Sequence, residues 1–220
     1  MHPHPNAMLI GAGGLPLSFR SSAATSMVSA TVTKPSGVAV GDLVFVIVPY
    51  STSTAVRATM STSGGASWNR DVSVDTLAYG AALLWKILNA TDVSNAWNIA
   101  DATNYYVLAV AYSQNGPPIV SATLKQAVGS GTTAQTTMNF SAISKSAGSR
   151  SIIILGIDRD ATVTPSPPAG WSLDINSTDS VFDKFATNIP SSTYTGTSIS
   201  IGGMFASPGY PECGWAFEII

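Results

Sequence analysis

Two uninterrupted apolar stretches constrain the fold of this sequence more than any other feature. Residues 43–48 have the sequence LVFVIV and residues 152–155 have the sequence IIIL. Successive side chains of a strand point to opposite faces of its sheet, so strands built from these residues are apolar on both faces. Such strands must lie inside sheets that are covered on both sides, by another sheet or by a neighbouring subunit. The same argument places residues 105–112 and 214–220 in or near the middle of their sheets.

Turn residues separate further strand-like segments along the chain. Stretches such as "KPSG", "SQNGPP" and "TPSPPAG" interrupt segments rich in β-branched and aromatic residues, and no stretch has a convincing 3.6-residue period. The expected strands span residues 29–33, 43–48, 77–88, 96–99, 105–112, 119–124, 138–143, 151–157, 180–187, 196–201 and 213–220. We therefore expect an all-β fold, an antiparallel two-sheet β-sandwich of jelly-roll or Ig-like topology. Residues 1–20 would form an extended N-terminal arm, and residues 21–220 a single sandwich domain.

The chain of 220 residues carries unusually few charges. Charged residues make up 10% of it and hydrophobic residues 45%, whereas about 25% of an average soluble domain is charged. An exterior made of Ser, Thr, Asn, Ala and Gly gives a lone monomer little charge repulsion to keep it dispersed. We therefore expect permanent assembly into a homo-oligomer, for which a trimer is one candidate symmetry.

Charge and hydropathy argue against nucleic-acid and membrane partners. The formal net charge is −2, and no basic patch of the kind that attracts nucleic acid or anionic lipid is present. The apolar runs are far shorter than the ~18 residues of a spanning helix. Secretion is not expected either, because the N-terminal sequence MHPHPNAMLI is a poor match to a secretory signal. Cys213, the single cysteine, is expected to be a small buried hydrophobic residue of a protein that is not oxidised.

Residue types that perform catalysis are sparse. His2 and His4 are the two histidines of the chain and stand among prolines, so no folded base is expected for a nucleophilic hydrolase, and the two make a weak metal site. Asp158 and Asp160 resemble a glycosidase pair, but aspartates after a strand are more often turn residues. Three further aspartates follow them, Asp174, Asp179 and Asp183. We expect no enzyme activity, no catalytic residue, no bound metal and no cofactor.

Two tryptophans are candidate contacts for a ligand. Trp68 follows "TSGGAS" and Trp171 follows "PPAG", so both stand where a loop becomes a strand. Exposed aromatic rings bind sugars in carbohydrate-binding sandwiches, but an aromatic residue that begins a strand more often closes the end of the core. Trp68 and Trp171 are therefore candidate glycan contacts, with core packing as the favoured alternative.

Four segments share a pattern with a group of known proteins. They are "TVTKPSGVAVGDLVFVIV", "ALLWKILNATDVSNAWNI", "YYVLAVAYS" and "TVTPSPPAGWSL". The K-P-x-G-V-x-x-G-D entry into an apolar strand, the W-K segment and the P-A-G-W strand start resemble a family of β-sandwich proteins of tailed bacteriophages and prophages. The resemblance extends from about Ser29 to the C-terminus. Residues 91–98 depart from it, because relatives often carry an E-P-x-x-Y turn where this chain has "TDVSNAWN".

The resemblance implies a virion structural component, either a tail-fibre or tail-tip piece or a capsid-decoration or head-fibre protein. Such a protein is made in the host cytoplasm without a signal peptide and has other virion proteins as partners. The N-terminal arm would be its docking segment, through Met8, Leu9, Ile10, Leu15 and Leu17. The alternatives are a carbohydrate-binding module or adhesin that recognises host surface polysaccharide and, with least support, a polysaccharide hydrolase.

Overall fold

Antiparallel strands make up most of the described chain. The computed structural model describes residues 17–25, 31–50, 58–76, 79–100, 107–114, 116–129, 135–158, 165–177, 183–190, 194–204 and 213–220. The elements are β1 (Ser18–Thr25), β2 (Thr31–Val32), β3 (Leu43–Tyr50), β4 (Thr59–Thr62), β5 (Asn69–Thr76), β6 (Tyr79–Ile87), α1 (Ala90–Ser94), β7 (Trp97–Ala100), β8 (Val107–Ser113), β9 (Ala122–Gly129), β10 (Thr137–Phe140), β11 (Ser151–Asp158), β12 (Ser172–Ser177), β13 (Asp183–Pro190), β14 (Ile199–Gly202) and β15 (Cys213–Ile219).

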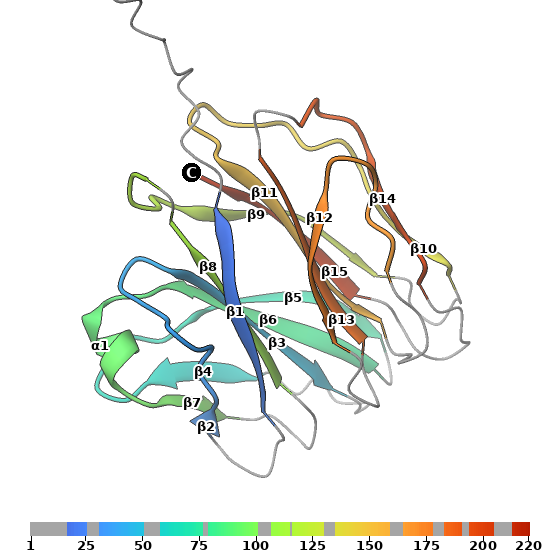
Figure 1. Cartoon of the computed structure of the whole chain (residues 1–220). Helices are drawn as coiled ribbons and strands as arrows, with labels where there is room; N and C mark the ends of the chain where they lie inside the picture. Colours follow the sequence, from blue (N-terminus) through green and yellow to red (C-terminus); the bar gives the residue numbers. More distant parts are fainter. Residues whose placement is uncertain are drawn as a thin grey trace, which may run out of the picture.

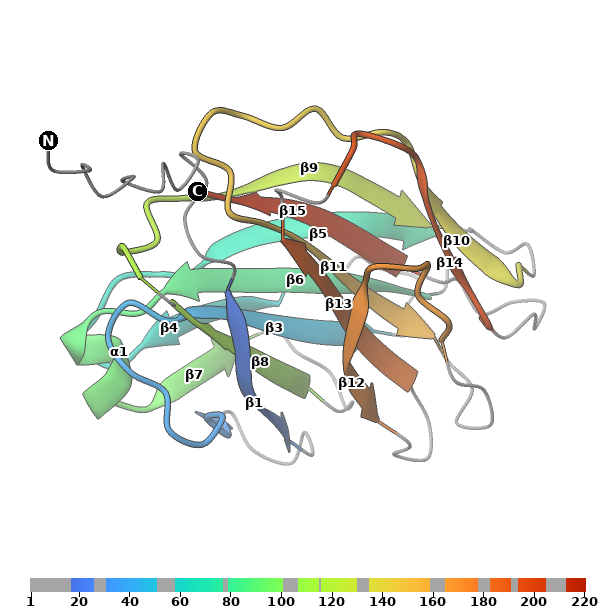
Figure 2. The same ribbon diagram turned by 45° about the horizontal axis from the view of Figure 1, so that its top comes forward.

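The strands form four antiparallel sheets that stack in layers (Figures 1 and 2). The first large sheet has the order β1-β8-β3-β6-β5, and the second large sheet has the order β12-β13-β11-β15-β9. The first small sheet, β2-β7-β4, covers the outer face of the first large sheet, and the second small sheet, β10-β14, covers that of the second. The predicted all-β sandwich is thus confirmed, with four sheets in place of the expected two.

Each apolar strand is buried on both faces, as its sequence requires. Leu43, Phe45 and Ile47 of β3 lie in the core between the two large sheets, whereas Val44 and Val46 lie in the core under the first small sheet. β11 alternates in the same way between the central core and the core under the second small sheet. β3 and β11 are the middle strands of their sheets, and β8 and β15 are interior. The expected central positions of all four apolar segments are therefore confirmed.

The two large sheets have the same topology, so the described chain contains a structural repeat. β1, β3, β5, β6 and β8 of the first repeat correspond in chain order to β9, β11, β12, β13 and β15 of the second, and the corresponding strands have the same neighbours. The small sheets correspond too, because β7 pairs with β2 and β14 pairs with β10. The register gives residue equivalences: Phe45 lies opposite Val110, and Ile153 lies opposite Phe217.

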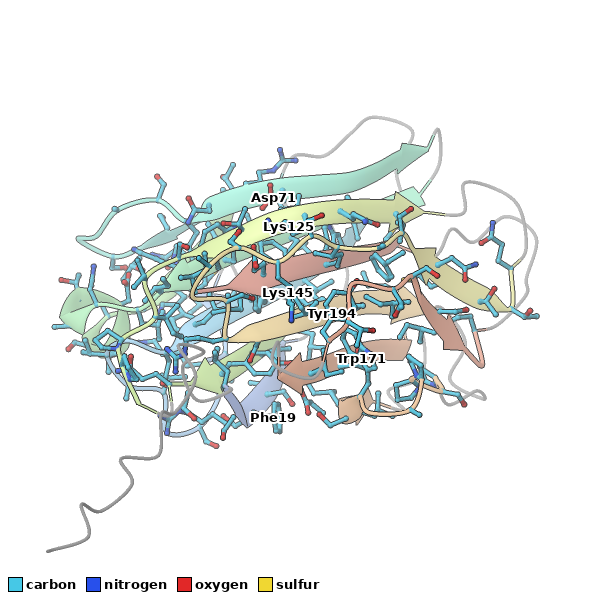
Figure 3. All side chains as sticks on the ribbon, turned by 90° about the horizontal axis from the view of Figure 1, so that it is seen from above. Phe19, Asp71, Lys125, Lys145, Trp171 and Tyr194 are labelled. Atoms are coloured by element: carbon cyan, nitrogen blue, oxygen red, sulfur yellow. The ribbon has the colours of Figure 1, made fainter. Side chains whose placement is uncertain are left out.

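The repeats pack face to face in a reciprocal arrangement. β5 of the first repeat contacts β9 and β15 of the second, and Figure 3 shows β5, marked by Asp71, next to β9, marked by Lys125. In the opposite direction β12, the equivalent of β5, meets β8, the equivalent of β15, where the Tyr112 hydroxyl donates to Asp174 Oδ2 at 3.1 Å. Each repeat thus buries the same face of its large sheet against the other, and the packing is closer on the β5 side than on the β12 side.

Aromatic rings fill the interface between the repeats. Phe217 packs edge to face against Phe45, with ring centroids 5.0 Å apart, and against Trp85 at 5.9 Å. Tyr112 packs in the same way against Phe45 at 6.3 Å. Such pairs contribute about 0.5–1.5 kcal/mol each beyond the burial of their area. The rings therefore fasten the two repeats into one body.

The second small sheet is narrower than the first for an identifiable reason. β4 pairs with β7 over four residues, whereas its counterpart in the second repeat is a single bridge between Ser166 and Gly202. The residues after Ser166 are Pro167 and Pro168. Proline has no N–H to donate to a ladder, so pairing cannot continue along β14. The prediction that "TPSPPAG" forms a loop agrees with this geometry.

Several local predictions need correction. β1 and β4 were not expected, because their side chains are largely polar or small. β5 and β12 agree with the strand starts expected at Trp68 and Trp171, but their bounds were not predicted, because many of their side chains are polar. α1 was not expected either: at five residues it is too short for a helical period. A capping box makes it, since Asn89 accepts from the Asp92 N–H and the Asp92 carboxylate accepts from the Asn89 N–H.

The N-terminal boundary differs slightly from the predicted arm. β1 begins at Ser18 and pairs with β8, and the Leu17 N–H donates to Ser151 Oγ at 3.1 Å. Residues 17–20 therefore belong to the sandwich, and residues 1–16 lie outside the described part of the chain.

The close approach of the second small sheet to β15 predicts that Gly214→Ala is destabilising. A Cβ at Gly214 would meet Met138 Sδ and would lie 2.9 Å from Phe140 Cζ. Overpacking of this kind costs about 1–3 kcal/mol. The matched control is Gly202→Ala, whose Cβ would have its nearest neighbour at 3.9 Å. Urea unfolding should show the loss for Gly214→Ala alone; equal stabilities of the two variants would contradict the packing.

Candidate functional site

The two tryptophans singled out in the sequence occupy equivalent positions in the two repeats. Trp68 directly precedes β5 and Trp171 directly precedes β12, and each is followed three residues later by an aspartate, Asp71 or Asp174. Trp68 is 6% exposed and lies in the core under the first small sheet. Trp171 is half-buried against the core under the second small sheet (Figure 3). Neither ring is a fully exposed platform, and the core-packing interpretation of Trp68 is confirmed.

The proposed docking residues divide between the core and the undescribed N-terminus. Leu17 is 4% exposed and belongs to the central core, so it is not a surface contact. The other docking candidates lie outside the described residues, as do both histidines: Met8, Leu9, Ile10, Leu15, His2 and His4. Cys213 is buried in β15, which confirms its predicted role as a small core residue.

The aspartates considered for catalysis do not form a described pair. Asp160 and Asp179 lie outside the described residues, and Asp158 and Asp183 are described only through the backbone pairing of β11 with β13. Asp174 accepts hydrogen bonds from Tyr112 and from Ser172 Oγ. Burial raises the pKa of Asp174, although both of these hydrogen bonds favour its charged form. Asp174 therefore joins the repeats.

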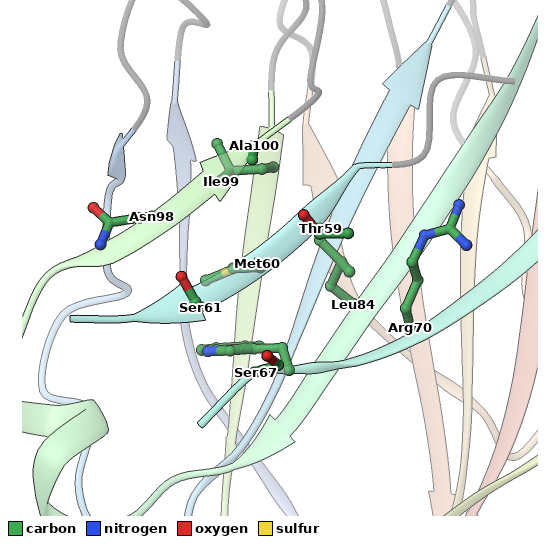
Figure 4. Close-up of a pocket in the computed structure, with 10 residues that line it drawn as sticks. Thr59, Met60, Ser61, Ser67, Arg70, Leu84, Asn98, Ile99 and Ala100 are labelled. Carbon is green, nitrogen blue, oxygen red and sulfur yellow. The ribbon is translucent and has the colours of Figure 1, made fainter. Parts of the chain in front are cut away.

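A pocket of about 360 Å³ opens in the first repeat, where the first small sheet meets the edge of the first large sheet. β4 lies between β7 on one side and the chain before β5 on the other, which the Trp68 N–H joins to Met60 O at 3.0 Å. Figure 4 shows Asn98 and Arg70 on opposite sides of the β4 residues. The buried residues that form the floor are Met60, Trp68, Leu84 and Ile99. The exposed or half-buried residues at the rim are Thr59, Ser61, Ser67, Arg70, Asn98 and Ala100.

Hydrogen bonds and ring contacts hold the pocket tryptophan in place. The Trp68 ring packs edge to face against Trp97 at a centroid distance of 4.9 Å, and its Nε1–H donates to Thr62 Oγ1 at 3.2 Å. Thr62 in turn donates to Asp92 Oδ1 at 2.6 Å. The Asp92 carboxylate therefore fixes the Trp68 ring through the Thr62 hydroxyl. This part of the pocket floor is held in place before any ligand binds.

Asp92 is a buried carboxylate behind Trp68, and it forms an ion pair with Lys86. The side chain is fully buried, and the Lys86 ammonium lies 2.7 Å from its Oδ1. Burial raises the pKa of Asp92, but hydrogen bonds from the Asn89 N–H, Lys86 and Thr62 outweigh it, so the pKa lies below its ordinary value of 3.8. Asp92 is thus a structural anion and not a proton donor.

Lys34 binds backbone carbonyl groups of α1. Its ammonium donates to the carbonyl oxygens of Asp92 at 2.9 Å and Val93 at 2.7 Å, and it lies 5.3 Å from the centroid of the Trp97 ring. Burial lowers the pKa of Lys34, and the Asp92 charge offsets part of that effect. The K-P-x-G-V segment therefore has a structural role, in securing the short helix.

The second repeat lacks the residues that build the pocket. By register, Leu173 stands where the first repeat has Arg70, and Ile199 stands where it has Trp97. The two prolines end the counterpart of β4, and no helix is described between β13 and β14. Arg70 and Asn98 were not predicted as site residues, because a lone polar residue within a strand gives no signal of a site before the sheets are assembled.

Other classes of site receive little support from the described residues. Among them no group of three or more His, Cys, Asp or Glu side chains is arranged to hold a metal ion. No helix among the described residues is long and apolar enough to cross a bilayer. No protein-family model, curated protein or solved structure matches the chain.

The buried Asp92 pair predicts a large loss of stability for Asp92→Asn. The change leaves the Lys86 ammonium without its counter-charge, which costs about 3–5 kcal/mol when a buried pair is broken. Ser94→Ala is the matched control, since Ser94 is exposed on the same helix and such changes stay within about 0.5 kcal/mol. Urea unfolding at neutral pH measures both.

The pH dependence of that loss identifies its cause. Because the folded-state pKa of Asp92 is lowered, its stabilisation is present above pH 3.8, the ordinary value, and is lost as pH falls through the folded-state pKa. The difference between wild type and Asp92→Asn should therefore shrink in acid. A difference that stays constant down to pH values below 3 would show that the charge is not responsible.

Proposed function

We propose that this chain is a non-enzymatic structural component of a bacteriophage virion that acts through protein–protein assembly. A tail-fibre or tail-tip piece and a capsid-decoration or head-fibre protein are the two forms that the sequence resemblance implies. The resemblance rests on the "KPSGVAVGD" entry into β3, the "LLWK" segment of β6 and the "PPAGW" entry into β12. These motifs have structural roles, which supports a structural protein.

The use of the buried charges is the observation that carries the proposal. Each charged side chain of the described interior fastens a loop or a strand end. Asp42 binds Arg20 of β1 at 2.7 Å and the Ala39 N–H at 2.7 Å. Arg150 donates to Pro117 O at 2.7 Å. Glu218 accepts from Lys125 at 2.7 Å and from Ser146 Oγ at 2.8 Å. Groups committed in this way favour a scaffold over a catalyst.

The surface composition supports assembly. Only 10% of the chain is charged, and Val40 and Val120 are 57% and 77% exposed. Contact with further copies or with other virion proteins would cover such surface, as a homo-oligomer for which a trimer is a candidate symmetry. We assign docking to Met8, Leu9, Ile10 and Leu15, because Leu17 belongs to the core.

Glycan recognition is the second candidate function, and the pocket of the first repeat favours it. The exposed tryptophan platform considered from the sequence does not describe Trp68, which is buried. A pocket with an aromatic floor and a polar rim is the form of glycan site that fits these residues.

Mass spectrometry of density-purified particles, from a host that carries the gene, tests the assignment. The expected result is this chain at fixed stoichiometry with virion proteins, and its absence from the particles would contradict the proposal. A variant lacking residues 1–16 should keep the wild-type circular dichroism and melting temperature, because the sandwich begins at Leu17. It should no longer enter particles. Incorporation at the wild-type level would exclude the docking role of the arm.

A further inference from the structure

The pocket of the first repeat is a local departure from an otherwise shared plan. The second repeat has a leucine, Leu173, at the position of Arg70, and this leucine packs against the core under its small sheet. The shared topology therefore does not require a charged residue there. The first repeat also has β4, α1 and the Trp68–Trp97 pair, all of which border or support the pocket. Such a concentration of local features at one cavity points to a binding role.

The lining chemistry defines the ligand. Met60, Leu84, Ile99 and Trp68 offer an apolar floor, and hydroxyl and amide groups of Ser61, Thr59 and Asn98 stand at the rim. A sugar ring has a complementary character, with apolar C–H faces and hydroxyl groups that both donate and accept hydrogen bonds. The volume of about 360 Å³ lies at the small end of the range for ligand pockets, which suits one or two sugar rings.

Arg70 supplies the charge preference. Among the described residues that line the pocket it is the one charged side chain, and none of them carries a carboxylate. Its Nε–H donates to Ala58 O at 2.9 Å, which orients the guanidinium and uses one of its five N–H groups. A planar guanidinium binds a carboxylate more strongly than it binds a neutral oxygen. A carboxylate on the ligand would meet a positive group here, and no described lining residue is an anion that would repel it.

We propose that this pocket binds a carboxylate-bearing sugar, such as a uronic acid unit of an acidic polysaccharide, with Arg70 as the carboxylate partner and Trp68 in the floor. This inference rests on the second candidate function, glycan recognition, and is independent of the virion role, since the site is complete within the first repeat. Its ligand could come from a polymer or from the free acid, because both carry the same ring and carboxylate.

Saturation-transfer NMR on the full chain tests the proposal, with glucuronate, oligoglucuronate and glucose as probes. Both acidic probes, or the oligomer alone, should bind and glucose should bind at least about tenfold more weakly, the factor expected for one charge-assisted hydrogen bond. Oligomer binding alone would indicate a polymer source. No binding of either acidic probe at millimolar concentration, or equal binding of glucose, would overturn the proposal.

Variants locate the binding. Arg70→Gln should weaken oligoglucuronate binding by about tenfold or more, and Lys145→Gln is the charge-matched control at an exposed lysine outside the pocket. Ser61→Trp fills the rim from an exposed position without removing a core contact, so it should abolish binding and keep the melting temperature. Wild-type affinity in Ser61→Trp would place the ligand elsewhere, and wild-type affinity in Arg70→Gln would exclude the carboxylate contact.

Discussion

The layering of the molecule follows from strands that are apolar on both faces. Each such strand needs a neighbouring sheet on either side. Folding would lose about 25 cal/mol of stabilisation for each Å² of apolar surface left in water. β3 and β11 are the middle strands of the two large sheets, and one face of each contributes to the core between those sheets. The outer faces of both sheets then still need a cover, which the two small sheets provide. Four layers are thus the minimal solution within one chain.

The structural repeat shows how one chain meets this requirement. A single five-stranded sheet with one small sheet would leave its inner face bare. The second repeat presents the same face, and the interface is closed by the contacts of β5 with β9 and β15 and, at the other edge, by the hydrogen bond between Tyr112 of β8 and Asp174 of β12. Covalent linkage removes the entropy of association between the halves. Arrangement in tandem therefore gives a closed central core that does not depend on protein concentration.

The sequence predicts the inner strands well and the edges poorly, for a physical reason. β3, β8, β11 and β15 are surrounded by protein, so burial alone selects their residues and the pattern is unmistakable. Edge strands such as β1 and β12 meet solvent on one side, and their small or polar residues also suit a loop. An apolar face does not state what covers it, so the number of layers was not predictable. The repeat is hidden because packing conserves burial, as in Phe45 and Ile153, rather than residue identity.

The candidate pocket lies at the edge of the sheets, where packing constrains the residues least, and this explains why the sequence did not predict it. In the second repeat, Leu173 adds apolar burial and Pro167 and Pro168 end the edge, which is sufficient for folding. Arg70 at the same place gives up that burial and needs a carbonyl partner, Ala58 O, to be accommodated. In the proposed glycan site, the ligand carboxylate is a second partner that the Arg70 guanidinium would bind and that a leucine at this position could not.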